Sequence, residues 1–201
     1  MRRFAAPLAA VLALATGCAS APKVTTWKNP DVGPVVFKKL AVFAFAVDPA
    51  VRRTVENSFA RSLSGESRAT PSYTFVNGAE LKDKDAVLAK IKAGGYDGIV
   101  AFRLIAIDEH QKESYAVVGY SSPYYAGWGG YYGTYGVSAY GTTYSTKEQI
   151  VQIETTAYAV DGEKLAWAAQ TQLQDPKSTL DVIDEIVGGA VAGMKKDGLI
   201  R

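Results

Sequence analysis

The chain has 201 residues, with 22 basic and 20 acidic side chains, one cysteine and one histidine. Its length suits a single domain that can bury a sizeable core, and a lone cysteine excludes an intramolecular disulfide and a thiolate metal cluster. The nearly balanced charge argues against nucleic acid as a partner, because such proteins need a net positive face.

The amino terminus has the three parts of an export signal. Arg2 and Arg3 are followed by an apolar stretch over residues 4–15 and then by Thr16 and Gly17. About 20 apolar residues are needed to cross a bilayer, so this shorter run predicts a signal peptide over residues 1–17 that is removed. Its removal leaves 20 basic and 20 acidic residues, a formal net charge of zero.

The end of this signal resembles the lipobox of bacterial lipoproteins. It reads Leu14-Ala15-Thr16-Gly17-Cys18, with Ala15 where the family usually has leucine three residues before the cysteine. The resemblance implies that Cys18 is acylated, becomes the first mature residue and anchors the chain to a membrane. Ser20, rather than an aspartate just after the cysteine, implies the outer membrane. We expect the domain on its periplasmic side, although the sequence carries no signal for the leaflet.

Residues 18–38 are expected to form a lipidated tether. Three prolines and no apolar periodicity over residues 19–38 favour a chain without regular structure. Trp27 leaves two alternatives open: it packs back on the domain, or it marks a contact site. Residues 39–201 are then one domain.

The first half of that domain predicts strands alternating with helices. Residues 40–47 form an apolar run typical of a buried strand, and Asp48-Pro49 suits the start of a helix. A short strand over residues 73–76, a helix over 83–93 ended by Gly94-Gly95, and an apolar strand over 98–107 follow. The first helix is expected to turn Val51, Val55, Phe59 and Leu63 inward and Arg52, Arg53, Glu56 and Arg61 to solvent.

The second half predicts a hairpin and a closing helix. Strands over residues 150–160 and 165–173 are joined through Asp161-Gly162, a strong hairpin signal. One face of the second strand is expected to carry Leu165, Trp167, Ala169, Thr171 and Leu173. The closing helix begins near Ser178, and its expected apolar stripe is Leu180, Ile183, Val187, Ala190, Val191 and Met194.

This order of elements predicts an α/β fold: one domain with a mixed parallel and antiparallel sheet and three helices packed on it. The topology resembles the α/β domains of envelope accessory lipoproteins, including the curli secretion lipoprotein and the lipoprotein activators of penicillin-binding proteins. The chain also resembles a family of bacterial outer-membrane lipoproteins through Thr-Trp-Lys-Asn-Pro (26–30), a Tyr/Gly-rich insertion and Asp-Gly-Leu-Ile (197–200). That resemblance implies an address and no activity.

Catalytic and metal-binding motifs are sparse. Asp108-Glu109-His110 could bind a metal or move protons, but consecutive residues at a strand end point to alternate faces and favour a solvated turn. We therefore expect no catalytic residue, no metal ligand and no cofactor.

An insertion at residues 114–146 breaks the globular pattern. Its 33 residues carry no charge and hold nine of the twelve tyrosines, interleaved with glycines. It is either a low-complexity loop, a segment packed on its own domain, or a contact surface, since Tyr, Trp, Gly and Ser combine contact area with an adaptable backbone. The candidate partner-binding residues are Trp128, Tyr124, Tyr125, Tyr131, Tyr132 and Tyr135.

These observations favour a non-enzymatic envelope lipoprotein that binds a protein or glycan partner. Two other functions stay open: an envelope hydrolase acting on peptidoglycan or polysaccharide, and a structural subunit of an envelope assembly. A pair of facing carboxylates would favour the hydrolase, because two-carboxylate chemistry needs that geometry.

Overall fold

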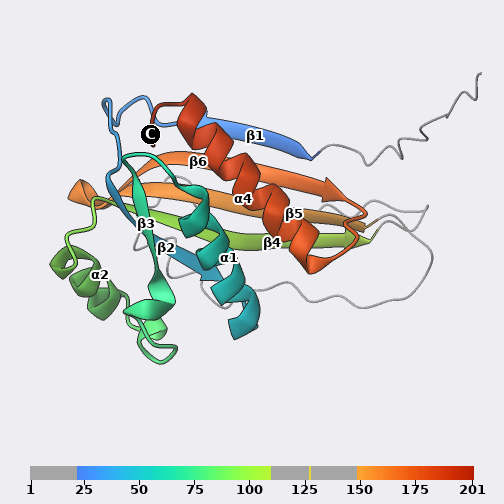
Figure 1. Cartoon of the computed structure of the whole chain (residues 1–201), viewed down its shortest axis with the longest axis horizontal. Helices are drawn as coiled ribbons and strands as arrows, with labels where there is room; N and C mark the ends of the chain where they lie inside the picture. The colour runs from blue at the N-terminus through green and yellow to red at the C-terminus, as the bar shows by residue number, and fades with distance from the viewer. Residues whose placement is uncertain (1–21, 110–126, 128–148) are drawn as a thin grey trace, which may run out of the picture.

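A computed structural model describes residues 22–109, 127 and 149–201 and confirms the α/β fold (Figure 1). In this part of the chain, six strands form one mixed sheet in the order β1-β6-β5-β4-β2-β3. The strands are β1 (Lys23–Lys28), β2 (Lys39–Phe45), β3 (Arg68–Pro71), β4 (Gly98–Glu109), β5 (Gln149–Ala159) and β6 (Lys164–Gln174). The helices are α1 (Pro49–Ser62), α2 (Lys84–Ala93) and α4 (Thr179–Lys196), with short 3-10 turns η1 (Ser72–Thr74), η2 (Glu80–Lys82) and η3 (Asp161–Glu163).

The sheet has a parallel half and an antiparallel half. β2 is parallel to both β3 and β4, whereas β4, β5, β6 and β1 pair antiparallel in turn. Helices α1 and α4 share one hydrophobic core with one face of the sheet, and α2 shares a second core with the other face. The sheet is therefore covered on both faces, by α1 and α4 on one and by α2 on the other.

The predicted helix starts are confirmed by their caps. Asp48 accepts a hydrogen bond from the Ala50 N–H (2.7 Å), and Ser178 accepts one from the Asp181 N–H (3.1 Å). Such caps satisfy amide groups that the first turn of a helix leaves unpaired. The hairpin between β5 and β6 is confirmed as well, with Gly162 at φ 71° in the connecting turn.

The prediction of an unstructured tether is wrong for residues 23–28, which form β1 at the edge of the sheet. All six residues of β1 are exposed, so the strand lacks the apolar run that marks a buried strand. Helix α4 packs on one side of it, where a Cβ added to Gly189 would lie 3.4 Å from Val24. Trp27 points to the other face and stays 41% exposed.

Residues 73–76 do not form the predicted strand. The strand is β3, which ends at Pro71, and the chain then enters the 3-10 turn η1. The Tyr73 N–H donates to the Glu56 carboxylate (3.0 Å), so this amide is not available for a strand ladder. A side chain 17 residues earlier in the sequence thereby decides the local backbone.

Two apolar side chains differ from their predicted positions. A register shift in the β5–β6 pairing makes Trp167 the partner of Ala157 and Leu165 the partner of Tyr158, which moves Leu165 to the α2 face. Leu180, expected in the stripe of α4, is 62% exposed, and Ile186 is buried instead. Leu180 lies in the first turn of α4 and projects beyond the core.

Candidate functional site

A buried polar cluster joins α1 to the carboxyl ends of β2 and β3. Glu56 is fully buried and Arg52 is 9% exposed, although both were predicted to face solvent. The prediction is wrong because helical periodicity assigns charged residues to the outer face without seeing a partner on another element. The pair is one helical turn apart, with Arg52 Nε 2.9 Å from Glu56 Oε1.

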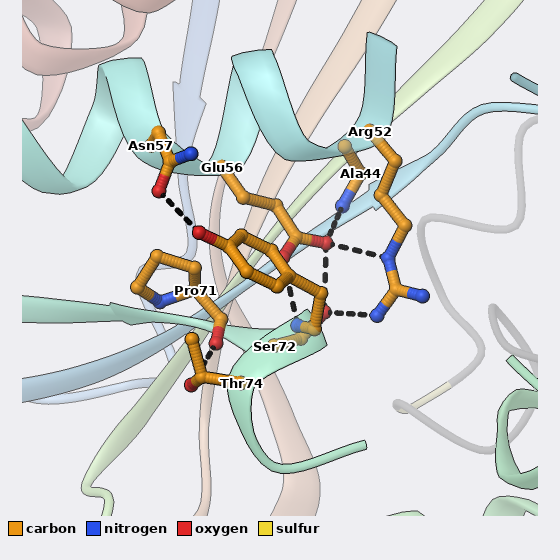
Figure 2. Close-up of polar contacts among 8 residues, drawn as sticks. Ala44, Arg52, Glu56, Asn57, Pro71, Ser72 and Thr74 are labelled. Atoms are coloured by element: carbon orange, nitrogen blue, oxygen red, sulfur yellow. Dashed lines mark hydrogen bonds and ion pairs between the residues drawn. The ribbon is translucent and has the colours of Figure 1, made fainter. Parts of the chain in front are cut away.

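Four donors surround the Glu56 carboxylate (Figure 2). Its Oε1 accepts from the Ala44 N–H (3.1 Å), from Arg52 Nε (2.9 Å) and from Ser72 Oγ (2.7 Å). Its Oε2 accepts from the Tyr73 N–H (3.0 Å). An ionised carboxylate offers about four acceptor positions, so these bonds use its capacity and tie together α1, β2 and η1.

The Ser72 hydroxyl closes the cluster on itself. Arg52 Nη2 donates to Ser72 Oγ (2.7 Å), while Ser72 Oγ donates to Glu56, so three side chains form a ring of hydrogen bonds (Figure 2). Beside this ring, Tyr73 Oη donates to Asn57 Oδ1 (2.8 Å). Apart from the Arg52–Glu56 pair, which lies within α1, each of these contacts crosses from α1 to the turn that follows β3.

A hydroxyl 2.7 Å from a carboxylate could act as a nucleophile beside its base. Here the carboxylate also accepts hydrogen bonds from a guanidinium and from two backbone N–H groups, so its acceptor positions are already occupied. The geometry of Glu56 and Ser72 therefore fits a structural clamp that fixes the ends of two parallel strands against α1.

A second buried ion pair lies on the other face of the sheet. Arg103 on β4 and Glu154 on β5 are register partners, with Nη2 2.9 Å from Oε2, and they are 8% and 0% exposed. Local sequence patterns do not single out this pair. The available signal is a charged residue inside each of two apolar strands, which requires a compensating partner when both strands are central.

The residues expected to carry chemistry or binding are only partly described. Asp108 accepts a hydrogen bond from Gln152 Nε2 (2.9 Å), and Glu109 ends β4. Within the described ranges, no three His, Cys, Asp or Glu side chains gather into a possible metal site. His110 and Cys18 lie outside the described residues. All the candidate contact residues also lie outside them: Trp128, Tyr124, Tyr125, Tyr131, Tyr132 and Tyr135.

The two ends of the insertion and the start of β1 lie at the same end of the sheet. Glu109 at the end of β4 is the register partner of Gln149 at the start of β5, so the insertion leaves and re-enters the sheet at adjacent positions. Lys23, the first residue of β1, pairs with Gln172 near the end of β6, at the same end of the sheet (Figure 1). We call this the anchor-proximal end, because the sequence predicts a lipid anchor at Cys18, five residues before Lys23.

Helix α4 also begins at the anchor-proximal end, since only four residues separate the end of β6 from Thr179. Two of the exposed large apolar side chains in the described residues lie here: Leu180 in the first turn of α4, and Ile107 on β4, which is 49% exposed. Ile107 pairs with Val151, which belongs to the core beneath α1 and α4, so Ile107 points to that same face.

A smaller ion pair on the α2 side predicts a pH effect. Lys90 lies 2.7 Å from Glu80, and together with the Asn77 N–H it holds the pKa of the Glu80 carboxyl below its ordinary value. A lowered pKa in the folded state means that ionised Glu80 stabilises the fold above its ordinary pKa, and this stabilisation is lost as the pH falls through the lowered value.

Glu80→Gln is therefore expected to lower the urea midpoint at pH 7 and to lose most of that difference from the parent at pH 3. Urea titrations of both proteins at the two pH values measure it. Glu185→Gln, at an exposed position on α4, is the matched control. A difference that persists unchanged at pH 3 would contradict the assigned role of the carboxylate.

Comparison with protein-family models finds no match, and comparison with curated proteins finds none either. Among solved structures, the PelC dodecamer from Paraburkholderia phytofirmans is similar, with 10% identity, 83% of this chain and 92% of that chain covered, and a TM-score of 0.45. The lipoprotein GNA1162 from Neisseria meningitidis is similar at 10% identity, with 79% and 98% covered and a TM-score of 0.40. These likenesses assign no family.

Within the described residues, no helix has the length and apolarity to cross a bilayer.

Proposed function

We propose that this chain is a non-enzymatic lipoprotein of the bacterial envelope, anchored through lipid on Cys18, whose domain binds a protein or glycan partner at the outer membrane. The observation that carries the proposal is the position of β1. Lys23 lies five residues after Cys18, and a chain spans at most about 3.6 Å per residue, so the anchor and the sheet are no more than about 18 Å apart. The domain is held beside the bilayer.

The contact surface of this proposal is the Tyr/Gly-rich insertion. Because Glu109 and Gln149 are register partners, the insertion begins and ends at the anchor-proximal end, the end of the sheet at which β1 also begins. Aromatic side chains with polar tips give large contact area at small entropic cost. The residues proposed to contact the partner are Trp128, Tyr124, Tyr125, Tyr131, Tyr132 and Tyr135.

The two buried carboxylates support binding over hydrolysis. A two-carboxylate hydrolase needs two acids that face each other across the bond to be cleaved. Glu56 is bound to Arg52 beneath α1, and Glu154 is bound to Arg103 on the opposite face of the sheet. Each carboxylate is thus neutralised by its own arginine, and the sheet separates the two.

The anchor is tested by Cys18→Ala, which is expected to release the protein from the membrane fraction or leave it unprocessed. Lipid chains contribute about 0.8 kcal/mol for each buried methylene, so their loss removes the main source of membrane affinity. Fractionation with an alkaline wash and the intact mass of the protein measure the effect. Ser20→Ala, which keeps the cysteine, should fractionate like the parent. An alanine variant that stays with the membrane through the wash would refute the lipid anchor.

A further inference from the structure

We propose that the domain stands end-on against the bilayer, with Ile107 and Leu180 seated in the lipid headgroup region. The proposal rests on the lipid anchor proposed above. It adds an orientation and a contact: the occupant of the exposed apolar patch at the anchor-proximal end is the surface of the membrane that holds Cys18.

Ile107 lies close to the row of the sheet at which β1 begins. Lys23 pairs with Gln172, while Leu173, one residue closer to the end of β6, pairs with Val151. Val151 in turn pairs with Ile107, so Ile107 lies one row nearer the anchor-proximal tip than the first residue of β1. The short chain from Cys18 reaches the domain at this level.

The distance across the sheet from β1 to β4 is comparable to the longest span of the chain from Cys18 to Lys23. Three strand spacings separate β1 from β4, which is about 14 Å across the sheet. The chain from Cys18 to Lys23 spans at most about 18 Å, so an anchored domain cannot move its anchor-proximal end far from the bilayer. Ile107 and Leu180 remain within a short distance of the headgroups in every orientation that keeps this end toward the membrane.

The two ends of the domain differ in their large exposed apolar side chains. At the anchor-proximal end, Ile107 is 49% exposed and Leu180 is 62% exposed, and neither contributes to the core. Charged side chains are exposed at this end too, among them Lys23 and Lys177. The turn between β5 and β6, at the opposite end, carries exposed charged side chains and none of the large exposed apolar side chains of the described residues. Apolar side chains favour the boundary between headgroups and acyl chains, so the end that carries Ile107 and Leu180 is the one suited to face it.

The charges on α4 argue against an orientation in which the outer face of this helix lies flat on the bilayer. The outer face of this helix carries the exposed acids Asp181, Asp184 and Glu185, which would lose hydration against lipid. Leu180, in the first turn, is the large exposed apolar side chain of α4. An end-on orientation buries Leu180 and leaves Asp184 and Glu185, which lie further along the helix, in solvent.

Two side chains are sufficient for this contact because the anchor makes it intramolecular. A short linker gives an effective concentration in the millimolar range, so a contact too weak to hold a free protein can orient a tethered one. The patch therefore sets orientation, and the lipid sets affinity.

Fluorescent probes on single introduced cysteines test the orientation. Acylation uses the sulfur of Cys18, which is the only cysteine, so a second cysteine is the only free thiol. Lipidated protein with Ile107→Cys or Leu180→Cys carries an environment-sensitive probe in vesicles of phosphatidylethanolamine and phosphatidylglycerol that contain spin-labelled lipid. Matched controls at the opposite end are Asp161→Cys and Lys164→Cys.

The expected result is a blue shift and quenching by spin-labelled lipid at positions 107 and 180, and neither change at 161 and 164. A double variant, Ile107→Gln with Leu180→Gln, should reduce the quenching of a probe on Lys177→Cys, whereas Trp27→Gln should leave it unchanged. Positions 177 and 27 lie in the loop before α4 and in the distal half of β1.

Failure of the orientation and failure of the anchor give different results. Protein that is acylated by mass and bound to vesicles, with probes at 107 and 180 that stay in water or match those at 161 and 164, overturns the orientation alone. A blue shift that depends on protein density and is not quenched by lipid overturns it in favour of a second copy on the patch. Protein without acyl chains refutes the proposed anchor and the orientation with it.

Discussion

Glu56→Ala is expected to destabilise the domain by about 3–5 kcal/mol, as is usual when one partner of a buried ion pair is removed. The variant leaves the Arg52 guanidinium buried without its carboxylate, and it deprives the Ala44 and Tyr73 N–H groups of their acceptor. The attachment of α1 to β2 and to the turn after β3 is lost at the same point. Urea unfolding of the soluble domain measures the change.

A set of variants separates the charge from the packing. Glu56→Gln keeps the shape of the side chain and removes its charge, so it should recover only part of the stability. A double variant, Arg52→Met with Glu56→Gln, should cost less than the sum of its single variants, because it removes both charges together. Glu66→Gln, at a side chain that is 75% exposed, is the control and should change stability little. A loss below about 1 kcal/mol for Glu56→Ala would show that the cluster is dispensable.

Features that depend on neighbours in sequence could be predicted from it. The apolar spacing of α1 correctly placed Val55 and Phe59 in the core, and the caps Asp48 and Ser178 mark where two helices begin. The turn at Asp161-Gly162 likewise joins two paired strands. Each of these signals lies within one helical turn or one tight turn of the element that it defines.

Features that depend on distant partners could not be predicted in this way. Glu56 is buried because its acceptors are used by Ala44, 12 residues before it, and by Ser72, 16 residues after it. The edge strand β1 has one neighbour, β6, whose paired residues lie 139 to 149 positions later, and its exposed residues carry no apolar pattern. The bulge that turns Leu165 to the other face arises from the pairing of β5 with β6.

The consequences for function come from the same distant contacts. The strand β1 shortens the expected tether from about twenty residues to the few between Cys18 and Lys23. With the lipid anchor that we propose at Cys18, a domain on a long arm becomes one beside the membrane. The periodicity of α4 predicts that Leu180 is buried. It is exposed instead, and it forms part of the surface at the anchor-proximal end.

Replacing residues 120–143 by a short Gly/Ser linker is expected to leave the domain folded and to abolish partner binding. The fold should survive because the apolar residues of the two cores described here lie outside this window. Glu109 and Gln149 are already register partners, so a shorter connection closes the same pair of strands, and loop length enters stability only logarithmically. The urea midpoint of the soluble variant measures the first half of the prediction.

Partner binding should fail because the window contains the candidate aromatic contacts, and a few aromatic anchors often carry most of the energy of an interface. Cross-linking in cells followed by purification compares the partners of the parent with those of the linker variant. A milder variant changes Trp128, Tyr131 and Tyr132 to serine, and the matched control changes Tyr73, on the turn after β3, to phenylalanine. The milder variant should lose the partner and the control should keep it. An unfolded linker variant would place the window in the core, and an unchanged set of partners would show that recognition occurs on another surface of the domain.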